Sequence, residues 1–139
     1  MATIDKYNMP DDLYYTKDHA WIKVEGDLIR IGITDFMQQL AGDLTFIRLP
    51  RADKHLDLGK TLTSLQSGKW AGKILVPMAG TITDANRDLV DNPGTMNKDP
   101  YGQAWIAVMK PDDLEAGLKD LMQGAELETW LKEEIASHA

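Results

Sequence analysis

Alternation of apolar and polar residues runs through most of the chain and predicts a series of short β-strands. Residues 20–24 and 28–33 form two such runs, joined by Glu25-Gly26-Asp27, which is typical of a hairpin with one buried face. Further strands are predicted at residues 44–49, 61–66, 73–76, 80–83 and 105–109. The pattern therefore predicts a β-rich body.

Three segments have helical rather than strand spacing. Thr34 or Asp35 is a suitable N-cap for a short helix over residues 36–41, which Gly42 ends. A later helix is predicted to open at residues 111–113 and to break at Gly124, with its apolar positions at Leu114, Leu118, Leu121 and Met122. A last helix over residues 126–136 has one apolar face, formed by Leu127, Trp130, Leu131 and Ile135. We expect the last two helices to cover the β-rich body, which makes the fold class α+β.

The connecting segments are polar and rich in turn residues. Residues 51–60 are predicted to form a charged surface loop, and residues 88–102 contain two turn sequences around Pro93 and Pro100. Residues 1–12 are polar and contain Pro10, so we expect a loosely docked N-terminal arm. We expect residues 13–139 to form a single domain, since a chain with 43% hydrophobic residues at this length can build one core.

The acidic balance of the chain and its lack of cysteine exclude several classes of function. Its 22 Asp and Glu residues against 15 Lys and Arg residues give a net charge of -7, so we expect neither a nucleic-acid nor a membrane partner. No segment approaches the roughly 20 apolar residues that span a bilayer, and the first residues lack the pattern of a signal peptide, so we expect a cytoplasmic location. Without cysteine, any redox chemistry must come from a cofactor.

The sequence contains no group of residues whose spacing indicates a catalytic site. The histidines at positions 19, 55 and 138 are scattered, so none of them is placed by sequence to share a metal with another, and we expect no metal site. Neither a Walker-type nor a dinucleotide-binding glycine pattern is present. We expect the chain not to be an enzyme, and a small hydrolase is the weakest of the alternatives.

Lys69 is the strongest candidate for a functional residue. It lies in Ser67-Gly68-Lys69-Trp70-Ala71-Gly72, where glycines flank a lysine between two strand-like runs, and this pattern predicts a turn with the lysine at its apex. One interpretation is that Lys69 is simply a solvated charge that keeps the loop soluble. The other is an exposed amine that a modifying ligase can reach and that then projects a cofactor from a rigid pair of strands. Trp70 is interpreted as a core residue on the following strand in preference to a contact of the cofactor.

The chain resembles the H protein of the glycine cleavage system, a lipoyl carrier, from about Tyr14 to about Leu131. The resemblance is carried by Tyr15-Thr16-Lys17-Asp18-His19-Ala20-Trp21, Ile31-Gly32-Ile33-Thr34-Asp35, Gly42-Asp43, Ser67-Gly68-Lys69, Pro77-Met78-Ala79-Gly80, Asn86, Asp91-Asn92-Pro93, Asp99-Pro100-Tyr101-Gly102, Trp105 and Lys110-Pro111. It implies a lipoyl-domain-like antiparallel barrel or sandwich hybrid with C-terminal helices. It also implies that lipoate is bound covalently to Lys69.

Several positions around the expected lipoyl arm depart from the family. A glutamate lies three residues before the lipoyl lysine in the family, and this position is Gln66 here. Two carboxylates that stabilise the cationic aminomethyl cargo fall on Ala20 and Lys73. The interaction energy of two charges about 4 Å apart is several kcal/mol at an effective dielectric of about 20. Lys73 should therefore disfavour an ammonium on the arm. The resemblance also places Asp18 and Trp70 around the arm, and Lys73 can alternatively be an exposed strand residue that tolerates its charge.

These departures favour the H-protein-like lipoate-binding proteins of heterodisulfide-reductase-like sulfur oxidation, in which the arm carries sulfur. The expected partners are a lipoate-protein ligase, dihydrolipoamide dehydrogenase and the heterodisulfide-reductase-like complex. One alternative is the glycine cleavage H protein, which carries the aminomethyl group between the P and T proteins. Another is an unmodified structural or regulatory relative, because Gln66 weakens recognition by some ligases. We expect a monomer, since a carrier that visits several active sites gains little from a permanent interface.

Overall fold

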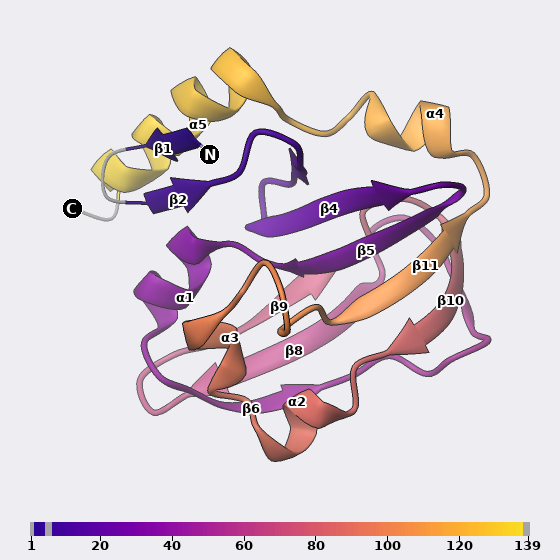
Figure 1. Ribbon diagram of the computed structural model, residues 1–139, viewed down its shortest axis with the longest axis horizontal. Helices are drawn as coiled ribbons and strands as arrows, with labels where there is room; N and C mark the ends of the chain where they lie inside the picture. The colour runs from indigo at the N-terminus through magenta and orange to yellow at the C-terminus, as the bar shows by residue number, and fades with distance from the viewer. Residues whose placement is uncertain (1, 5–6, 138–139) are drawn as a thin grey trace.

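The computed structural model describes residues 2–4 and 7–137, which fold into antiparallel sheets with short helices around them (Figure 1). The strands are β1 (Ala2–Ile4), β2 (Tyr7–Met9), β3 (Tyr14–Tyr15), β4 (Ala20–Glu25), β5 (Leu28–Ile33), β6 (Leu44–Arg48), β7 (His55–Leu56), β8 (Thr61–Ser67), β9 (Ala71–Leu75), β10 (Gly80–Ala85) and β11 (Ala107–Pro111). The helices are α1 (Asp35–Ala41), α2 (Asp88–Asp91), α3 (Thr95–Lys98), α4 (Leu114–Leu118) and α5 (Gly124–Ser137).

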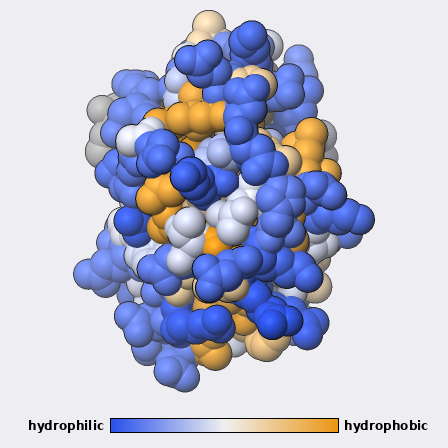
Figure 2. All heavy atoms as spheres, turned by 90° about the vertical axis from the view of Figure 1, so that its right-hand side faces the viewer, coloured by the Kyte–Doolittle hydropathy of each residue, from blue (hydrophilic) through white to orange (hydrophobic). Residues whose placement is uncertain are grey.

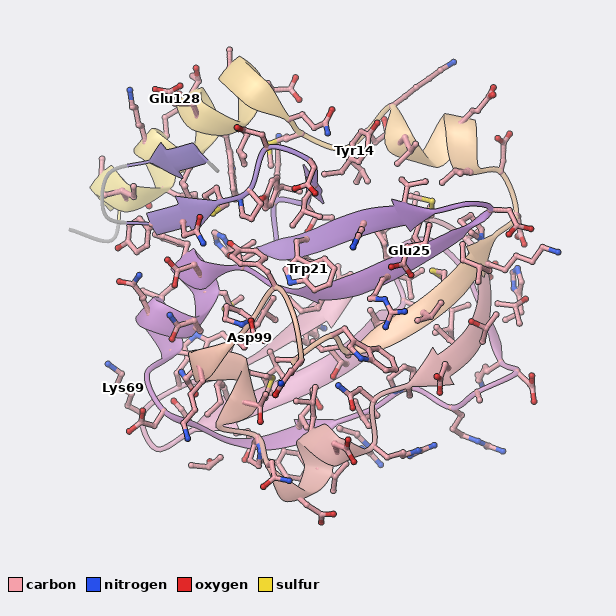
Figure 3. All side chains as sticks on the ribbon, viewed as in Figure 1. Tyr14, Trp21, Glu25, Lys69, Asp99 and Glu128 are labelled. Carbon is pink, nitrogen blue, oxygen red and sulfur yellow. The ribbon has the colours of Figure 1, made fainter. Side chains whose placement is uncertain are left out.

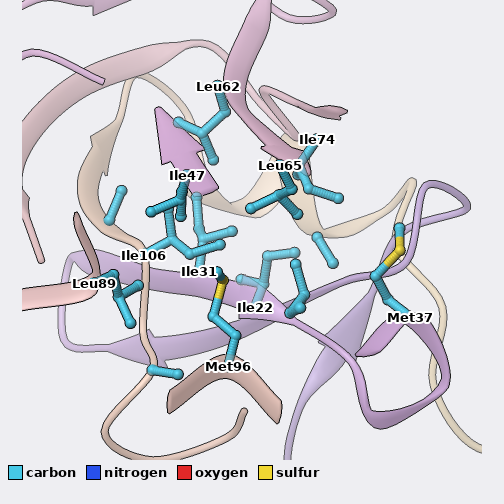
Figure 4. Close-up of a cluster of buried hydrophobic side chains, with 14 of the residues drawn as sticks. Ile22, Ile31, Met37, Ile47, Leu62, Leu65, Ile74, Leu89, Met96 and Ile106 are labelled. Carbon is cyan, nitrogen blue, oxygen red and sulfur yellow. The ribbon is translucent and has the colours of Figure 1, made fainter. Parts of the chain in front are cut away.

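Two of the sheets enclose the main hydrophobic core. The six-stranded sheet has the order β3-β4-β5-β11-β10-β7, and the three-stranded sheet has the order β6-β8-β9. Figure 4 shows Ile22 and Ile31 of the larger sheet facing Ile47 and Leu65 of the smaller one, and all four are buried. This arrangement confirms the predicted β-rich antiparallel sandwich with C-terminal helices.

The β4–β5 hairpin follows directly from its sequence. Glu25 pairs with Leu28 across the turn, and Gly26 adopts a φ of 67°, a left-handed conformation that glycine accepts without strain. Apolar residues on one face of β5, Ile29 and Ile31, are fully buried, as the alternation predicts. The predicted hairpin is therefore confirmed.

A second cluster of buried residues lies beneath α5 and joins the N-terminal strands to the body. Its members are Met9, Leu13, Tyr15, Trp21, Phe36, Met122, Leu127 and Leu131. The Tyr101 hydroxyl donates a hydrogen bond of 2.5 Å to the Asn8 carbonyl, and the Asn8 amide donates one of 2.8 Å to Asp35. Burial raises the pKa of Tyr101, so this hydroxyl remains a donor. Apolar packing and these bonds make residues 7–9 more firmly attached than the loosely docked arm that the polar composition predicts.

The C-terminal helices and the predicted loops differ in detail from the expectations. The predicted helix that opens at Pro111 is shorter, because β11 continues to Pro111, and the helix α4 ends at Leu118. The residues that follow turn back so that Met122 forms a bridge with Tyr15. The predicted loops at 51–60 and 88–102 contain the short strand β7 and the helices α2 and α3. No helix in the described ranges is long and apolar enough to cross a membrane.

The surface on the side of β10 and β11 is mostly hydrophilic. Figure 2 shows this side, on which apolar residues form separate patches among polar ones. The same distribution is expected for a protein surface without one large apolar interface at this position.

Leu131→Ala should lower the free energy of unfolding by about 2–5 kcal/mol, because it creates a cavity beneath α5. Leu131 is fully buried. Lys132→Ala is the matched control on the same helix, since it removes only an exposed ion pair with Glu128 and should change the free energy by no more than about 0.5 kcal/mol. Urea unfolding of both variants measures the difference. Equal stability of the two variants would contradict the packing of α5 on the body.

Candidate functional site

Lys69 lies at the tip of the hairpin between β8 and β9. The strand β8 ends at Ser67 and β9 begins at Ala71. The Ser67 amide donates a hydrogen bond of 2.8 Å to the Trp70 carbonyl, which closes the turn. Gly68, Lys69 and Trp70 form the turn between the two strands, and Gly68 and Lys69 are exposed. Figure 3 shows Lys69 at the edge of the molecule, on the side away from the surface of Figure 2. The amine of Lys69 is therefore accessible to a partner protein.

Two contacts attach this exposed turn to the body. The Ser67 hydroxyl donates a hydrogen bond of 2.7 Å to the carbonyl of Ala41, the last residue of α1. The Trp70 side chain is half-buried and packs against the main core. Its ring lies over Gly72, where an added Cβ would be 2.3 Å from a ring atom, so only glycine leaves room for it. Trp70 thus lies in the turn and contributes to the core at the same time.

The end of α1 leaves space for the lysine side chain. Gly42 has a φ of 78°, and a Cβ added there would lie 3.0 Å from Cε of Lys69. Asn97 of α3 fixes the backbone at this glycine and just after it. Its Nδ2 donates to the Gly42 carbonyl at 2.8 Å, and its Oδ1 accepts from the Leu44 amide at 2.9 Å. Gly42 is predicted from the sequence as a helix end and is one of the residues that carry the family resemblance, whereas no local pattern indicates a role for Asn97.

Gln66 and Lys73 lie together on the outer face of the three-stranded sheet. Gln66 pairs with Phe46 on one side and Ala71 on the other, while Lys73 and Arg48 both pair with Ser64. Residues that pair across strands point to the same face, and positions two apart on a strand also share it. Gln66 and Lys73 are exposed, whereas Leu65, which lies between Ser64 and Gln66 on β8, points inward and is fully buried. The structure therefore brings Gln66 and Lys73 together next to the turn that bears Lys69.

Asp18 and Ala20 have different surroundings from these residues. Ala20 is fully buried in the main core. The Asp18 carboxylate accepts hydrogen bonds from the Leu75 amide, at 2.7 Å, and from the Thr16 hydroxyl. Asp18 also lines a groove of about 490 Å³, together with Leu75 at the far end of β9. At about 3.3 Å per residue of strand, Leu75 lies about 20 Å from Lys69, so Asp18 holds the opposite end of the strand.

The hairpin is chemically simple. Lys69 forms no ion pair with any residue of the described ranges, and no group of three or more His, Cys, Asp or Glu side chains there is arranged to hold a metal ion. An exposed amine on a fixed turn can receive an acyl group and display it. The space beside Gly42 accommodates the alkyl stem of the lysine whether or not its amine is acylated.

Comparison with known proteins gives the family. The profile described as "Glycine cleavage H-protein" matches residues 13–134. The chain belongs to the glycine cleavage H-protein family. A probable glycine cleavage system H protein of Pyrococcus horikoshii is 39% identical over 133 residues, which cover 95% of this chain and 98% of that protein. The H protein of Bacteroides thetaiotaomicron is 41% identical over 115 residues, or 83% of this chain and 90% of that protein.

A solved structure agrees with this assignment. The crystal structure of a glycine cleavage system H protein from Mycobacterium marinum has a TM-score of 0.79 and a sequence identity of 30%, and the match covers 91% of this chain and 98% of that chain. H proteins are non-catalytic carriers that bear lipoate on a lysine, which confirms that this chain is a carrier with covalent lipoate and not an enzyme. The family also implies the P and T proteins and a lipoate ligase as partners.

Gly72→Ala should displace the Trp70 ring and loosen the lysine turn. The added methyl group overlaps the ring, and overpacking of this kind costs about 1–3 kcal/mol. Gly68→Ala is the matched control within the same turn, because a Cβ there meets nothing within 4 Å. The measurements are the indole N–H resonance of Trp70 and the melting temperature. A Trp70 resonance that is unchanged in Gly72→Ala would show that the ring does not depend on this glycine.

Proposed function

We propose that this chain is the lipoyl carrier of a glycine cleavage system and that Lys69 bears the lipoate. The observation that carries the proposal is the position of Lys69, which is exposed at a turn that Ser67 and Trp70 attach to the body. A ligase must reach the amine from outside, and a fixed turn then holds the base of the arm at a defined point while the arm moves.

The groups around Lys69 fit an acylated lysine. Acylation removes the charge of the amine, and no described carboxylate loses an ion pair as a result, because Lys69 forms none. The bound lipoyl group supplies the dithiolane chemistry that a chain without cysteine lacks. The contribution of the protein is to position this group and to present it to the P protein, the T protein and dihydrolipoamide dehydrogenase in turn.

Lys69→Arg should abolish modification, because a guanidinium keeps the positive charge but provides no amine for amide formation. Lys73→Arg is the matched control on the same hairpin and should be modified as fully as the unchanged protein. The measurement is intact mass after reaction with lipoate, ATP and a lipoate-protein ligase, followed by peptide mapping across residues 65–73. A lipoyl increment that persists in Lys69→Arg would place the attachment elsewhere, and an unmodified Lys69 in protein from its native cells would favour a relative that has lost the cofactor.

Sulfur transport is a second candidate, favoured by one observation. Lys73 is exposed beside the lysine turn at a position where the family resemblance expects a carboxylate, and it has no ion-pair partner among the described residues. A cation there would stabilise an oxidised sulfur group, which is anionic, and the partner would be a heterodisulfide-reductase-like complex. The relatives described above are named as glycine cleavage H proteins, so they support the aminomethyl carrier better.

The two cargoes are distinguished by loading the lipoylated protein with glycine and the P protein. An aminomethyl carrier should show a glycine-dependent mass increase on the arm, measured as the fraction loaded at equilibrium, which does not depend on how tightly the P protein docks. A Lys73 that faces the cargo predicts a several-fold larger loaded fraction in Lys73→Asp, because the change replaces repulsion of the ammonium by attraction, whereas a Lys73 that serves docking alone predicts an unchanged fraction. Lys73→Gln removes the repulsion alone and should fall between the two. A protein that is not loaded, but whose turnover with a heterodisulfide-reductase-like complex falls in Lys73→Asp, would be a sulfur carrier instead.

A further inference from the structure

The outer face of the three-stranded sheet is basic, although the chain as a whole is acidic. We define this basic face by Phe46, Arg48, Ser64, Gln66, Ala71 and Lys73, which the strand register places in two rows on one surface. One row contains Arg48 and Lys73 with Ser64 between them. Every other residue of the basic face is uncharged, while the net charge of the chain is -7.

The positive charge continues beyond the end of β6. A hollow of about 270 Å³ begins at Arg48 and Ser64 and is also lined by Arg51 and Lys54. Its lining includes three basic side chains and no Asp or Glu. Asp53 lies between Arg51 and Lys54 in sequence, but it is not among the lining residues. The basic face and this hollow therefore form one continuous surface of a single sign of charge.

The basic side chains of this surface are available to a partner. Arg48, Arg51, Lys54 and Lys73 form no ion pair with any residue of the described ranges. Other basic side chains of the chain do have partners within it, as in the pair of Arg30 with Glu25 at 3.0 Å. Unpaired charges of one sign on an otherwise acidic protein attract an acidic surface and accelerate its association.

Phe46 adds an apolar anchor to this surface. Its side chain is a large hydrophobic group with 47% exposure, and it lies in the row nearest to the lysine turn, beside Gln66. Aromatic residues are enriched at the centres of protein interfaces, where they supply much of the binding energy. An exposed aromatic ring bordered by basic side chains suits a protein partner with an apolar pocket and an acidic rim.

We propose that the basic face is the docking surface for an acidic face of the P protein, the enzyme that loads the lipoyl arm, an inference that rests on the function proposed above for Lys69. Lys73 lies four residues from Lys69 on the same hairpin, which corresponds to about 13 Å at about 3.3 Å per residue. A partner seated on the basic face therefore has the base of the arm directly beyond its edge. The docked surface and the arm share one rigid hairpin, so docking also orients the arm.

The test is the steady-state loading of lipoylated protein by the P protein, with Arg48→Glu and Arg51→Glu combined. We expect KM for the carrier to rise roughly tenfold with kcat unchanged, and the salt dependence of kcat/KM to become weaker. Lys110→Glu combined with Lys119→Glu is the matched control, because it makes the same change in net charge at exposed positions outside the basic face. Melting temperatures of both double variants establish that they fold.

Phe46→Ala tests the apolar part of the basic face separately and should raise KM by an amount that does not depend on salt.

Equal KM values for the Arg48/Arg51 variant and the control would overturn the docking proposal while leaving the carrier function of Lys69 in place. Absence of loading in the unchanged lipoylated protein would overturn the proposed function and the docking proposal together. Binding of the unchanged protein to anionic lipid vesicles that is lost in the Arg48/Arg51 variant would assign the basic face to a membrane and overturn docking to an enzyme.

Discussion

The Trp70 ring packed over Gly72 is the contact on which the candidate site depends. A carrier lysine has to be exposed for its partners and yet held at a fixed point, and these two demands conflict in an ordinary surface loop. Here the residue after Lys69 turns inward against the core, and the hydroxyl of Ser67 binds the end of α1. The tip is therefore exposed at Gly68 and Lys69 and anchored on either side of them, at Ser67 and Trp70. Gly72 is required because any larger residue would occupy the place of the ring.

The parts of the fold that were predictable from sequence are those fixed by short-range patterns. The β4–β5 hairpin has its turn glycine and its alternating apolar residues in one continuous segment. The turn at Lys69 is similar, since its glycines and the flanking strands are adjacent in the chain. Thr34 accepts a hydrogen bond from the Met37 amide, as expected of the N-cap of α1. Each of these features depends on residues that are close together in sequence.

The remaining features depend on contacts between distant segments and could not be predicted locally. Asn97 binds the backbone at Gly42 and Leu44, more than 50 residues away, and nothing in its own segment identifies that role. The grouping of Arg48 with Lys73 requires the register of three strands, which the sequence does not specify by itself. The attachment of residues 7–9 depends on Tyr101 and Asp35 in the same way.

The strand register also changes the interpretation of the positive charge at Lys73. Considered alone beside the lipoyl lysine, a cation at this position indicates a cargo that is neutral or anionic. In the structure it shares a row with Arg48 on an exposed sheet face, next to a hollow lined by further basic residues. A residue that belongs to a docking surface needs no relation to the cargo, because its charge is then selected by the partner. The exchange of a carboxylate for Lys73 is therefore compatible with aminomethyl transport, and the family assignment and the local charge do not conflict.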